Sequence, residues 1–172
     1  MAQAVAKGQV IEQYGPYGSQ LPENYRVQLA DGERFTKLTV DSGYIVDGIK
    51  FVIAKPDGST RTVQIGGTSP PSSTHFVNQI VLKDGEYLTR VSGTYGYDRD
   101  RKQVDVATLK IHTNFNPQGY GPYGQGKNVD NLTNFSSPNK TDGPVVGVFG
   151  KCNNYIESIG VLVRKVRYNF QR

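Results

Sequence analysis

A short stretch, Gly43-Tyr44-Ile45-Val46-Asp47, combines residue types that could bind a neutral ligand rich in hydroxyl groups. Its glycine permits backbone conformations that other residues avoid, and it lets a partner approach the main chain closely. Its aspartate begins the apolar alternation of residues 47–53, which is typical of a β-strand. A carboxylate fixed in such a loop, beside free main-chain amides, can accept charge-assisted hydrogen bonds from hydroxyl groups. Taken alone, Asp47 could equally do no more than hold its own turn together.

The same pattern returns twice further along the chain. The three segments that share the apolar alternation are residues 45–53, 107–111 and 155–163. Their acid position holds Asp47, Ala107 and Glu157 in turn. The pentapeptide Tyr-Gly-Pro-Tyr-Gly also occurs twice, at 14–18 and at 120–124. Internal repetition of this kind indicates three similar units, each with a glycine-rich loop and an apolar strand.

Strand-like stretches cover most of the chain, and no window combines helical apolar spacing with a capping box. Strands are expected at residues 9–13, 25–29, 35–41, 45–55, 60–65, 75–82, 87–95, 104–113, 145–149 and 155–163. The two pentapeptides are expected to form turns, and residues 125–144 a long polar loop. Three sheets that face a shared core would bury each apolar face. The sequence therefore predicts an all-β fold.

Chain length and charge bear on the number of domains and on the kind of binding partner. The 172 residues suffice for one domain with a sizeable core. The formal net charge is +5, and much of the excess lies in Arg99, Arg101, Lys102 and the run 164–167. Such charges could contact nucleic acid, anionic polysaccharide or acidic lipid. Because they are few and scattered, we interpret them as a solvated surface and expect no nucleic-acid partner.

The termini and the single cysteine bear on the cellular compartment. Cys152 cannot form an internal disulfide, so the fold does not depend on oxidation. The first residues lack an apolar run typical of a signal peptide, and no later segment could insert into a membrane. We therefore expect a cytoplasmic protein, or a secreted one if a precursor segment was removed.

The sequence offers no recognisable catalytic machinery. Neither of the two histidines, His75 and His112, stands in a catalytic spacing with a serine, cysteine or acid. No local cluster of metal ligands is visible. We therefore expect a protein that is not an enzyme and that uses no cofactor and no metal.

The order of motifs resembles that of the jacalin-related lectins, whose fold is the β-prism I. The residues that carry the resemblance are Asp84-Gly85-Glu86-Tyr87-Leu88-Thr89-Arg90-Val91-Ser92-Gly93, Leu109-Lys110-Ile111-His112-Thr113-Asn114, Tyr120-Gly121-Pro122-Tyr123-Gly124 and Val145-Val146-Gly147-Val148-Phe149-Gly150, which leads into residues 155–160. The match covers about residues 9–163, so we expect one lectin domain over 1–172 with a basic tail at 164–172.

The resemblance also implies an architecture and an activity. The family's fold has three four-stranded Greek-key sheets arranged with pseudo-threefold symmetry. Its members generally form homo-oligomers and bind hexoses without metal. For this chain the resemblance implies binding of mannose/glucose-type glycans or glycoproteins.

Family sites pair a Gly-x-x-x-Asp turn with a glycine-rich loop. The resemblance therefore implies a carbohydrate site formed by Gly43, Tyr44, Ile45, Val46, Asp47, Gly66 and Gly67. Asp47 would accept hydrogen bonds from sugar hydroxyls, and the main-chain amides of Tyr44, Ile45 and Gly67 would donate to sugar oxygens. A turn that is retained without any ligand is the alternative.

A weaker second candidate site has the following residues: Asn153, Asn154, Tyr155, Glu157 and Gly18. In this copy asparagine replaces the family's glycine and glutamate its aspartate, while Pro22 lies near a donor position and has no N–H. We expect it to be weak, altered or inactive. The unit with Ala107 has no acid at all. Two alternative functions remain: an interaction or structural module that lost sugar binding, and a binder of anionic, sulfated glycans through the basic loops.

Overall fold

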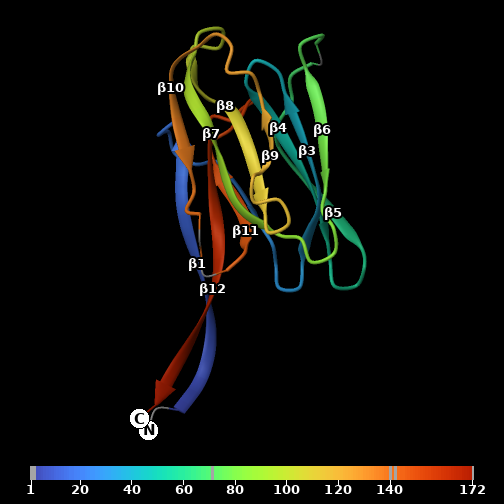
Figure 1. The fold of residues 1–172 in the computed structure, drawn as a ribbon, viewed down its shortest axis with the longest axis vertical. Helices are drawn as coiled ribbons and strands as arrows, with labels where there is room; N and C mark the ends of the chain where they lie inside the picture. The colour runs from blue at the N-terminus through green and yellow to red at the C-terminus, as the bar shows by residue number, and fades with distance from the viewer. Residues whose placement is uncertain (1–2, 71, 140, 142, 172) are drawn as a thin grey trace.

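Every regular element of the chain is a β-strand. The computed structural model describes residues 3–70, 72–139, 141 and 143–171 (Figure 1). In chain order the strands are β1 (Gln3–Gly18), β2 (Tyr25–Gln28), β3 (Arg34–Ser42), β4 (Val46–Ala54), β5 (Thr60–Gly66), β6 (Phe76–Val81), β7 (Leu88–Asp98), β8 (Gln103–Thr113), β9 (Tyr120–Tyr123), β10 (Val129–Ser136), β11 (Val145–Gly150) and β12 (Ser158–Gln171). Among these residues no helix could cross a membrane. The prediction of an all-β fold is confirmed.

The strands form three antiparallel sheets of four strands each. The strand orders are β5-β4-β3-β6, β10-β7-β8-β9 and β1-β12-β11-β2. We call the last one the terminal sheet, because it combines strands from both ends of the chain. In the other two sheets three consecutive strands form a meander and the fourth returns beside the first, which is a Greek key. The terminal sheet has the same order if the chain ends are joined, so the predicted threefold repetition is confirmed.

The core lies between the three sheets, and equivalent residues of the three units meet there. Ile49, Leu109 and Ile159 each follow the acid position of their unit by two residues, and all are at most 2% exposed. Residues on one face of a strand recur with a period of two, so alternate side chains of β4, β8 and β12 point into this shared space. Apolar burial along these strands stabilises the fold by about 25 cal/mol per Å².

One glycine in each unit lies directly against a neighbouring strand. Gly18, Gly66 and Gly124 have φ angles of 117°, 59° and 87°. A Cβ added to them would lie 2.5, 2.3 and 2.2 Å from the carbonyl oxygen of the residue at the acid position of the same unit. Only glycine combines such a backbone conformation with so close an approach. The three glycine-rich loops are therefore structurally equivalent.

Three expectations about individual strands were wrong. The pentapeptides do not form turns but lie within β1 and β9, both at sheet edges, and in each copy the ladder register shifts between the two tyrosines. An edge strand with a bulge tolerates a proline, which cannot donate to the ladder. The expected polar loop contains β10. Residues 164–171 are not a tail but continue β12, which pairs with β1 from Gln3 onward and projects beyond the prism (Figure 1).

The glycine contact leads to a stability prediction with a matched control. We expect Gly124→Ala to lower the free energy of unfolding by about 2 kcal/mol more than Gly58→Ala does, because the new methyl group collides with a backbone oxygen. Gly58 has the same φ of 87°, but a Cβ there meets nothing within 4 Å. Urea denaturation of both variants measures the difference. Equal losses would show that backbone conformation, and not the close contact, requires glycine at position 124.

Candidate functional site

Two turns and the start of β8 meet at one end of the prism, and they are the Gly-x-x-x-acid segment and its two equivalents. They comprise residues 43–47, 103–107 and 153–157. Backbone hydrogen bonds join them, because the N–H of Ile156 donates to the carbonyl of Val46 (3.3 Å) and the N–H of Val106 to the carbonyl of Ile156 (2.9 Å). The structure therefore brings both predicted sites together at this end.

The turn at residues 43–47 keeps two main-chain donors unpaired. The N–H of Gly43 donates to the carbonyl of Ile45 (2.9 Å), which closes the turn. The N–H groups of Tyr44 and Ile45 have no hydrogen-bond acceptor within the described part of the chain. A Cβ at Gly43 would lie 2.8 Å from the carbonyl oxygen of Thr74, so the loop before β6 requires a glycine here. The predicted donors Tyr44 and Ile45 thus lie in a turn that leaves their amides unpaired.

The Asp47 carboxylate is buried beside the His75 imidazole. The residue is 1% exposed, and neither carboxylate oxygen accepts a hydrogen bond from the described residues. The His75 Nε2 lies 3.8 Å from Asp47 Oδ2. Burial raises the pKa of Asp47 to about 6; His75 opposes this shift and the Asp41 carboxylate adds to it. Asp47 has acceptor capacity for a ligand, but the imidazole covers it.

Sequence reasoning missed His75 as part of this site. His75 stands 28 residues after Asp47, so sequence spacing does not associate it with the turn. The pairing of β3 with β6 places Phe76 opposite Ser42, and this register brings His75 next to the turn. In a Greek key the fourth strand, here β6, pairs with the first, here β3. This topology could have indicated that His75 lies near the turn, because the residues flanking Phe76 and Ser42 are then neighbours.

The Gly66-Gly67 loop also differs from the expectation. The N–H of Gly67, predicted as a donor to a ligand, donates instead to the carbonyls of Asp47 (2.9 Å) and Asn154 (2.8 Å). Next to it, the Thr68 hydroxyl donates to Asn154 Oδ1 (2.6 Å). Gly66 and Gly67 therefore hold the loop against the turns, and the Gly67 amide is not free to bind a ligand.

The second candidate turn has the same backbone but a different pattern of free groups. The N–H of Asn153 donates to the carbonyl of Tyr155 (3.0 Å), as Gly43 does in the first turn. The Asn153 side chain then accepts the N–H of Tyr155 at Oδ1 (2.9 Å). Glu157 is 4% exposed, and its carbonyl accepts the N–H of Ser19, the residue after Gly18 (3.0 Å). Asparagine in the place of glycine thus occupies an amide that stays unpaired in the first turn.

Cationic side chains cover the aromatic rings of both turns. The Lys127 Nζ lies 4.7 Å from the centre of the Tyr44 ring, and the Arg101 guanidinium lies 4.1 Å from the centre of the Tyr155 ring. Cation–π contacts of this kind hold the rings in place. One face of each ring is therefore already in contact with the chain.

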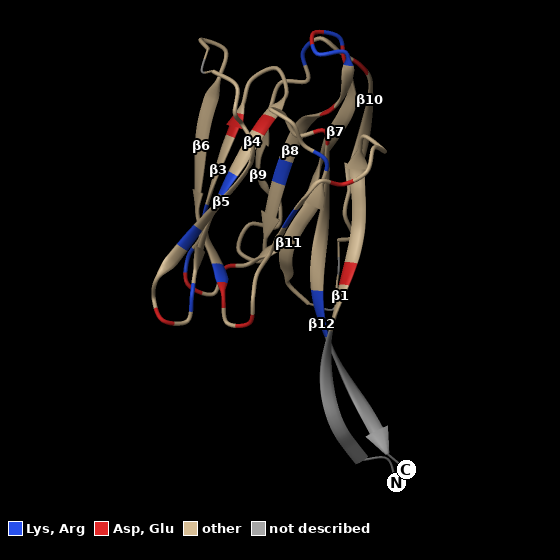
Figure 2. Ribbon diagram, turned by 180° about the vertical axis from the view of Figure 1, so that it is seen from behind, with Lys and Arg blue, Asp and Glu red and all other residues tan. Residues whose placement is uncertain are grey.

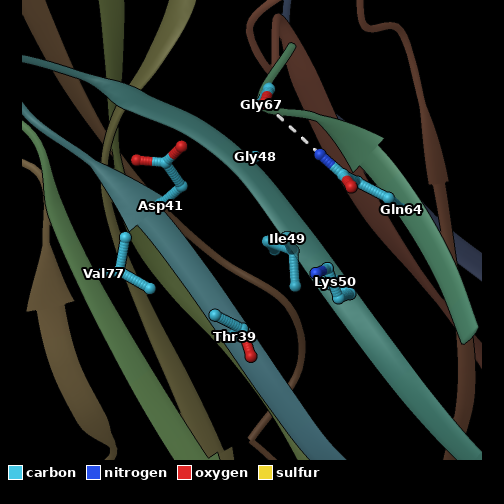
Figure 3. A pocket seen from close by; sticks show the side chains of 8 residues that line it. All are labelled: Thr39, Asp41, Gly48, Ile49, Lys50, Gln64, Gly67 and Val77. Atoms are coloured by element: carbon cyan, nitrogen blue, oxygen red, sulfur yellow. Dashed lines mark hydrogen bonds between the residues drawn. The ribbon is translucent and has the colours of Figure 1, made fainter. Parts of the chain in front are cut away.

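A cleft of about 160 Å³ lies on the outer face of the β3–β6 sheet, beside the first turn (Figure 3). Its lining residues are Thr39, Asp41, Gly48, Ile49, Lys50, Gln64, Gly67 and Val77. Figure 3 shows the Asp41 carboxylate and the Gln64 amide on either side of the backbone at Gly48. The cleft is open to solvent beside the first turn, and polar side chains form part of its lining.

The basic residues form ion pairs rather than a patch. Arg99 lies 3.5 Å from Asp130, Arg101 lies 3.2 Å from Asp98, and Arg164 lies 3.7 Å from an aspartate of the β2–β3 loop. In Figure 2 acidic and basic positions alternate over the ribbon that is coloured. This arrangement favours the interpretation of these charges as a solvated surface over the one in which they bind anionic glycans.

A buried pair of acids flanks the turn between β7 and β8. Asp98 and Asp105 are both 0% exposed. Asp98 accepts hydrogen bonds from the backbone N–H groups of Asp100 and Arg101 and from the Arg101 guanidinium. Gln103 donates to Asp105 Oδ1 (2.6 Å). Burial, together with a hydrogen bond to the Asp98 carboxyl, raises the pKa of Asp105 to about 8.

Three Greek-key sheets around one axis, with a Gly-x-x-x-acid turn and its two equivalents at one end, define a β-prism lectin domain. The chain belongs to the jacalin-like lectin domain family, whose model matches residues 14–162. The resemblance seen in the sequence is thereby confirmed. The family consists of carbohydrate-binding, non-catalytic proteins, in agreement with the expectation that this protein is not an enzyme.

Two relatives are about one-third identical to the chain over the residues that align. The chain is 35% identical over 118 residues to the jacalin-related lectin Calsepa of Calystegia sepium. The aligned residues cover 67% of this chain and 70% of that protein. The chain is 32% identical over 122 residues to the mannose/glucose-specific lectin of Parkia platycephala, over 70% of this chain and 26% of that lectin. The crystal structure of Calsepa lectin in complex with a bisected glycan matches with a TM-score of 0.72 at 27% identity, covering 88% of this chain and 96% of that one.

The raised pKa of Asp105 predicts how stability depends on pH. The folded chain keeps a proton up to about pH 8, whereas the unfolded chain releases it near the ordinary value of 3.8. Stability from this group is therefore present at low pH and lost as the pH rises toward about 8. We expect Asp105→Asn to remove a slope of up to about 1.4 kcal/mol per pH unit from the free energy of unfolding.

Urea denaturation between about pH 5 and pH 8 measures this slope. Asp84→Asn is the matched control, because the side chain of Asp84 is fully exposed. Parallel pH profiles for wild type and Asp105→Asn would contradict the prediction.

Proposed function

We propose that this protein binds mannose- or glucose-containing glycans through the turn at residues 43–47. One observation carries the proposal: the two Asp47 carboxylate oxygens lack donors, and the neighbouring amides of Tyr44 and Ile45 lack acceptors. A hexose offers both kinds of partner, because its hydroxyl groups can donate and accept. The mannose/glucose specificity of the Parkia lectin and the glycan bound to Calsepa support this substrate class.

The proposed binding mode uses only hydrogen bonds from the chain itself. Two sugar hydroxyls donate to Asp47, and the Tyr44 and Ile45 amides donate to sugar oxygens, which is the charge-assisted geometry that a carboxylate favours. The sugar can reach Asp47 only after the His75 imidazole has turned away. Rotation about side-chain bonds at a partly exposed residue is fast, so this requirement lowers affinity without blocking entry.

The other two turns contribute less in this proposal. The Tyr155 amide is occupied by Asn153, and Ala107 provides no carboxylate. Each chain then has one principal sugar site, which is shallow and weak by itself. Avidity for a branched glycan would come from several chains acting together, so we also propose that the protein works as a homo-oligomer.

Calorimetric titration with methyl α-mannoside, in buffer containing EDTA, tests the assignment. We expect Asp47→Asn to weaken binding by about tenfold or more, because hydrogen bonds to a charged acceptor are worth about 1.5–3 kcal/mol. The matched control is Glu157→Gln, which makes the same kind of change in the equivalent turn and should bind like wild type. His75→Ala should bind more tightly, because it removes the cover over Asp47.

The remaining outcomes separate the alternatives. Loss of binding in Glu157→Gln but not in Asp47→Asn would move the site to the second turn. Absence of heat from wild type and from His75→Ala, with methyl α-glucoside as well, would favour an interaction module that has lost sugar binding.

A further inference from the structure

Three side chains that can bind a metal ion converge beside the first turn. Asp41 comes from the end of β3, Asp47 from the start of β4, and His75 from the residue before β6. One donor atom of each lies within 4.8 Å of the other two. Sequence spacing gave no hint of this cluster, because its members are spread over 35 positions and only the pairing of β3 with both β4 and β6 brings them together.

The oxygens of this cluster are buried without hydrogen bonds. Asp41 Oδ1 and both oxygens of Asp47 have no hydrogen-bond partner among the described residues, and the Asp47 side chain is only 2% exposed. His75 faces both acids, with Nδ1 3.2 Å from Asp41 Oδ1 and Nε2 3.8 Å from Asp47 Oδ2, but not in hydrogen-bonding geometry. Two carboxylates in one buried place are costly unless a cation compensates them.

Other charges nearby do not provide that compensation. The Arg101 guanidinium acts on Asp47 from the neighbouring unit, but it is paired with Asp98 at 3.2 Å. His75 brings at most one positive charge for two acids. The cluster therefore combines unused oxygen acceptors, an imidazole nitrogen and a deficit of positive charge.

We propose that Asp41, Asp47 and His75 form a binding site for a divalent transition-metal ion of the zinc type. Imidazole nitrogen with carboxylate oxygen is a ligand set that zinc accepts, and three protein ligands leave a position for water. Calcium and magnesium fit less well, because they prefer shells made of oxygen alone. All three ligands stand at strand ends of one sheet, so the site is held by paired backbone.

The cleft beside the turn gives the ion a route of entry. Asp41 lines this cleft (Figure 3) and its side chain is 27% exposed, whereas the Asp47 side chain is only 2% exposed. The metal proposal does not depend on sugar binding, since it uses only the chain's own residues. If both hold, zinc and sugar compete for Asp47.

Calorimetric titration of zinc chloride into the full chain, previously stripped with a chelator and free of sugar, tests the proposal. We expect one zinc ion per chain, and a loss of affinity of about tenfold or more in Asp41→Asn and in His75→Gln. Thermal unfolding provides a second readout, because a ligand that binds only the folded state raises the Tm. Zinc should raise the Tm of wild type and not that of the two variants.

Two control variants test the alternative metal ligands. Asp84→Asn removes an exposed carboxylate elsewhere, and Cys152→Ser removes the single thiol; both should bind zinc like wild type. His112 is engaged on both ring nitrogens, by Ser92 and the carbonyl of Pro117. No saturable binding by wild type, binding by Asp41→Asn that equals wild type, or loss of zinc in Cys152→Ser would each overturn the proposal. If His75→Gln fails to fold, Asp41→Asn decides alone.

Discussion

The fold depends on the backbone contact of three residues at the prism axis, Val46, Val106 and Ile156. All three are 0% exposed, and Ile156 exchanges main-chain hydrogen bonds with both of the others. A buried peptide group that loses its hydrogen bond costs free energy of about 1–3 kcal/mol, so these bonds fix the three turns relative to one another. The turns can vary in their side chains, but they cannot move apart. That constraint explains why two units with altered acid positions still keep the backbone of the first.

The side chains of the three equivalent segments differ in the hydrogen bonds that they make. At residues 43–47 glycine leaves two amides unpaired beside a carboxylate, whereas at 153–157 the Asn153 side chain occupies the equivalent amide of Tyr155. The equivalent residues 103–107, at the start of β8, have no acid in the last position, and Gln103 instead accepts a hydrogen bond from the Asn153 amide (3.0 Å). Of the three segments, the one at 43–47 thus combines unpaired amides with a buried carboxylate, and a side-chain hydrogen bond joins the other two to each other.

The sequence predicted what local patterns determine. Apolar alternation and repetition were enough to place most strands and to align Asp47, Ala107 and Glu157. Strand β10 was not predicted, because only one of its eight residues, Phe135, is buried and its sequence shows no apolar alternation. The position of His75 beside Asp47 was not predicted for another reason. It follows from the register between β3 and β6, and the register between strands distant in sequence has no local signal.

The terminal sheet has a consequence for how the molecule is made. Each of the other two sheets pairs strands from one continuous segment, so each can assemble as soon as that segment has left the ribosome. The terminal sheet joins β1 to β12, which are far apart in the sequence, and it cannot close until β12 has been synthesised. Loop closure over so long a separation is entropically costly and slow. Until then the apolar faces of the first two sheets lack their third wall, and exposed apolar surface of this kind favours aggregation.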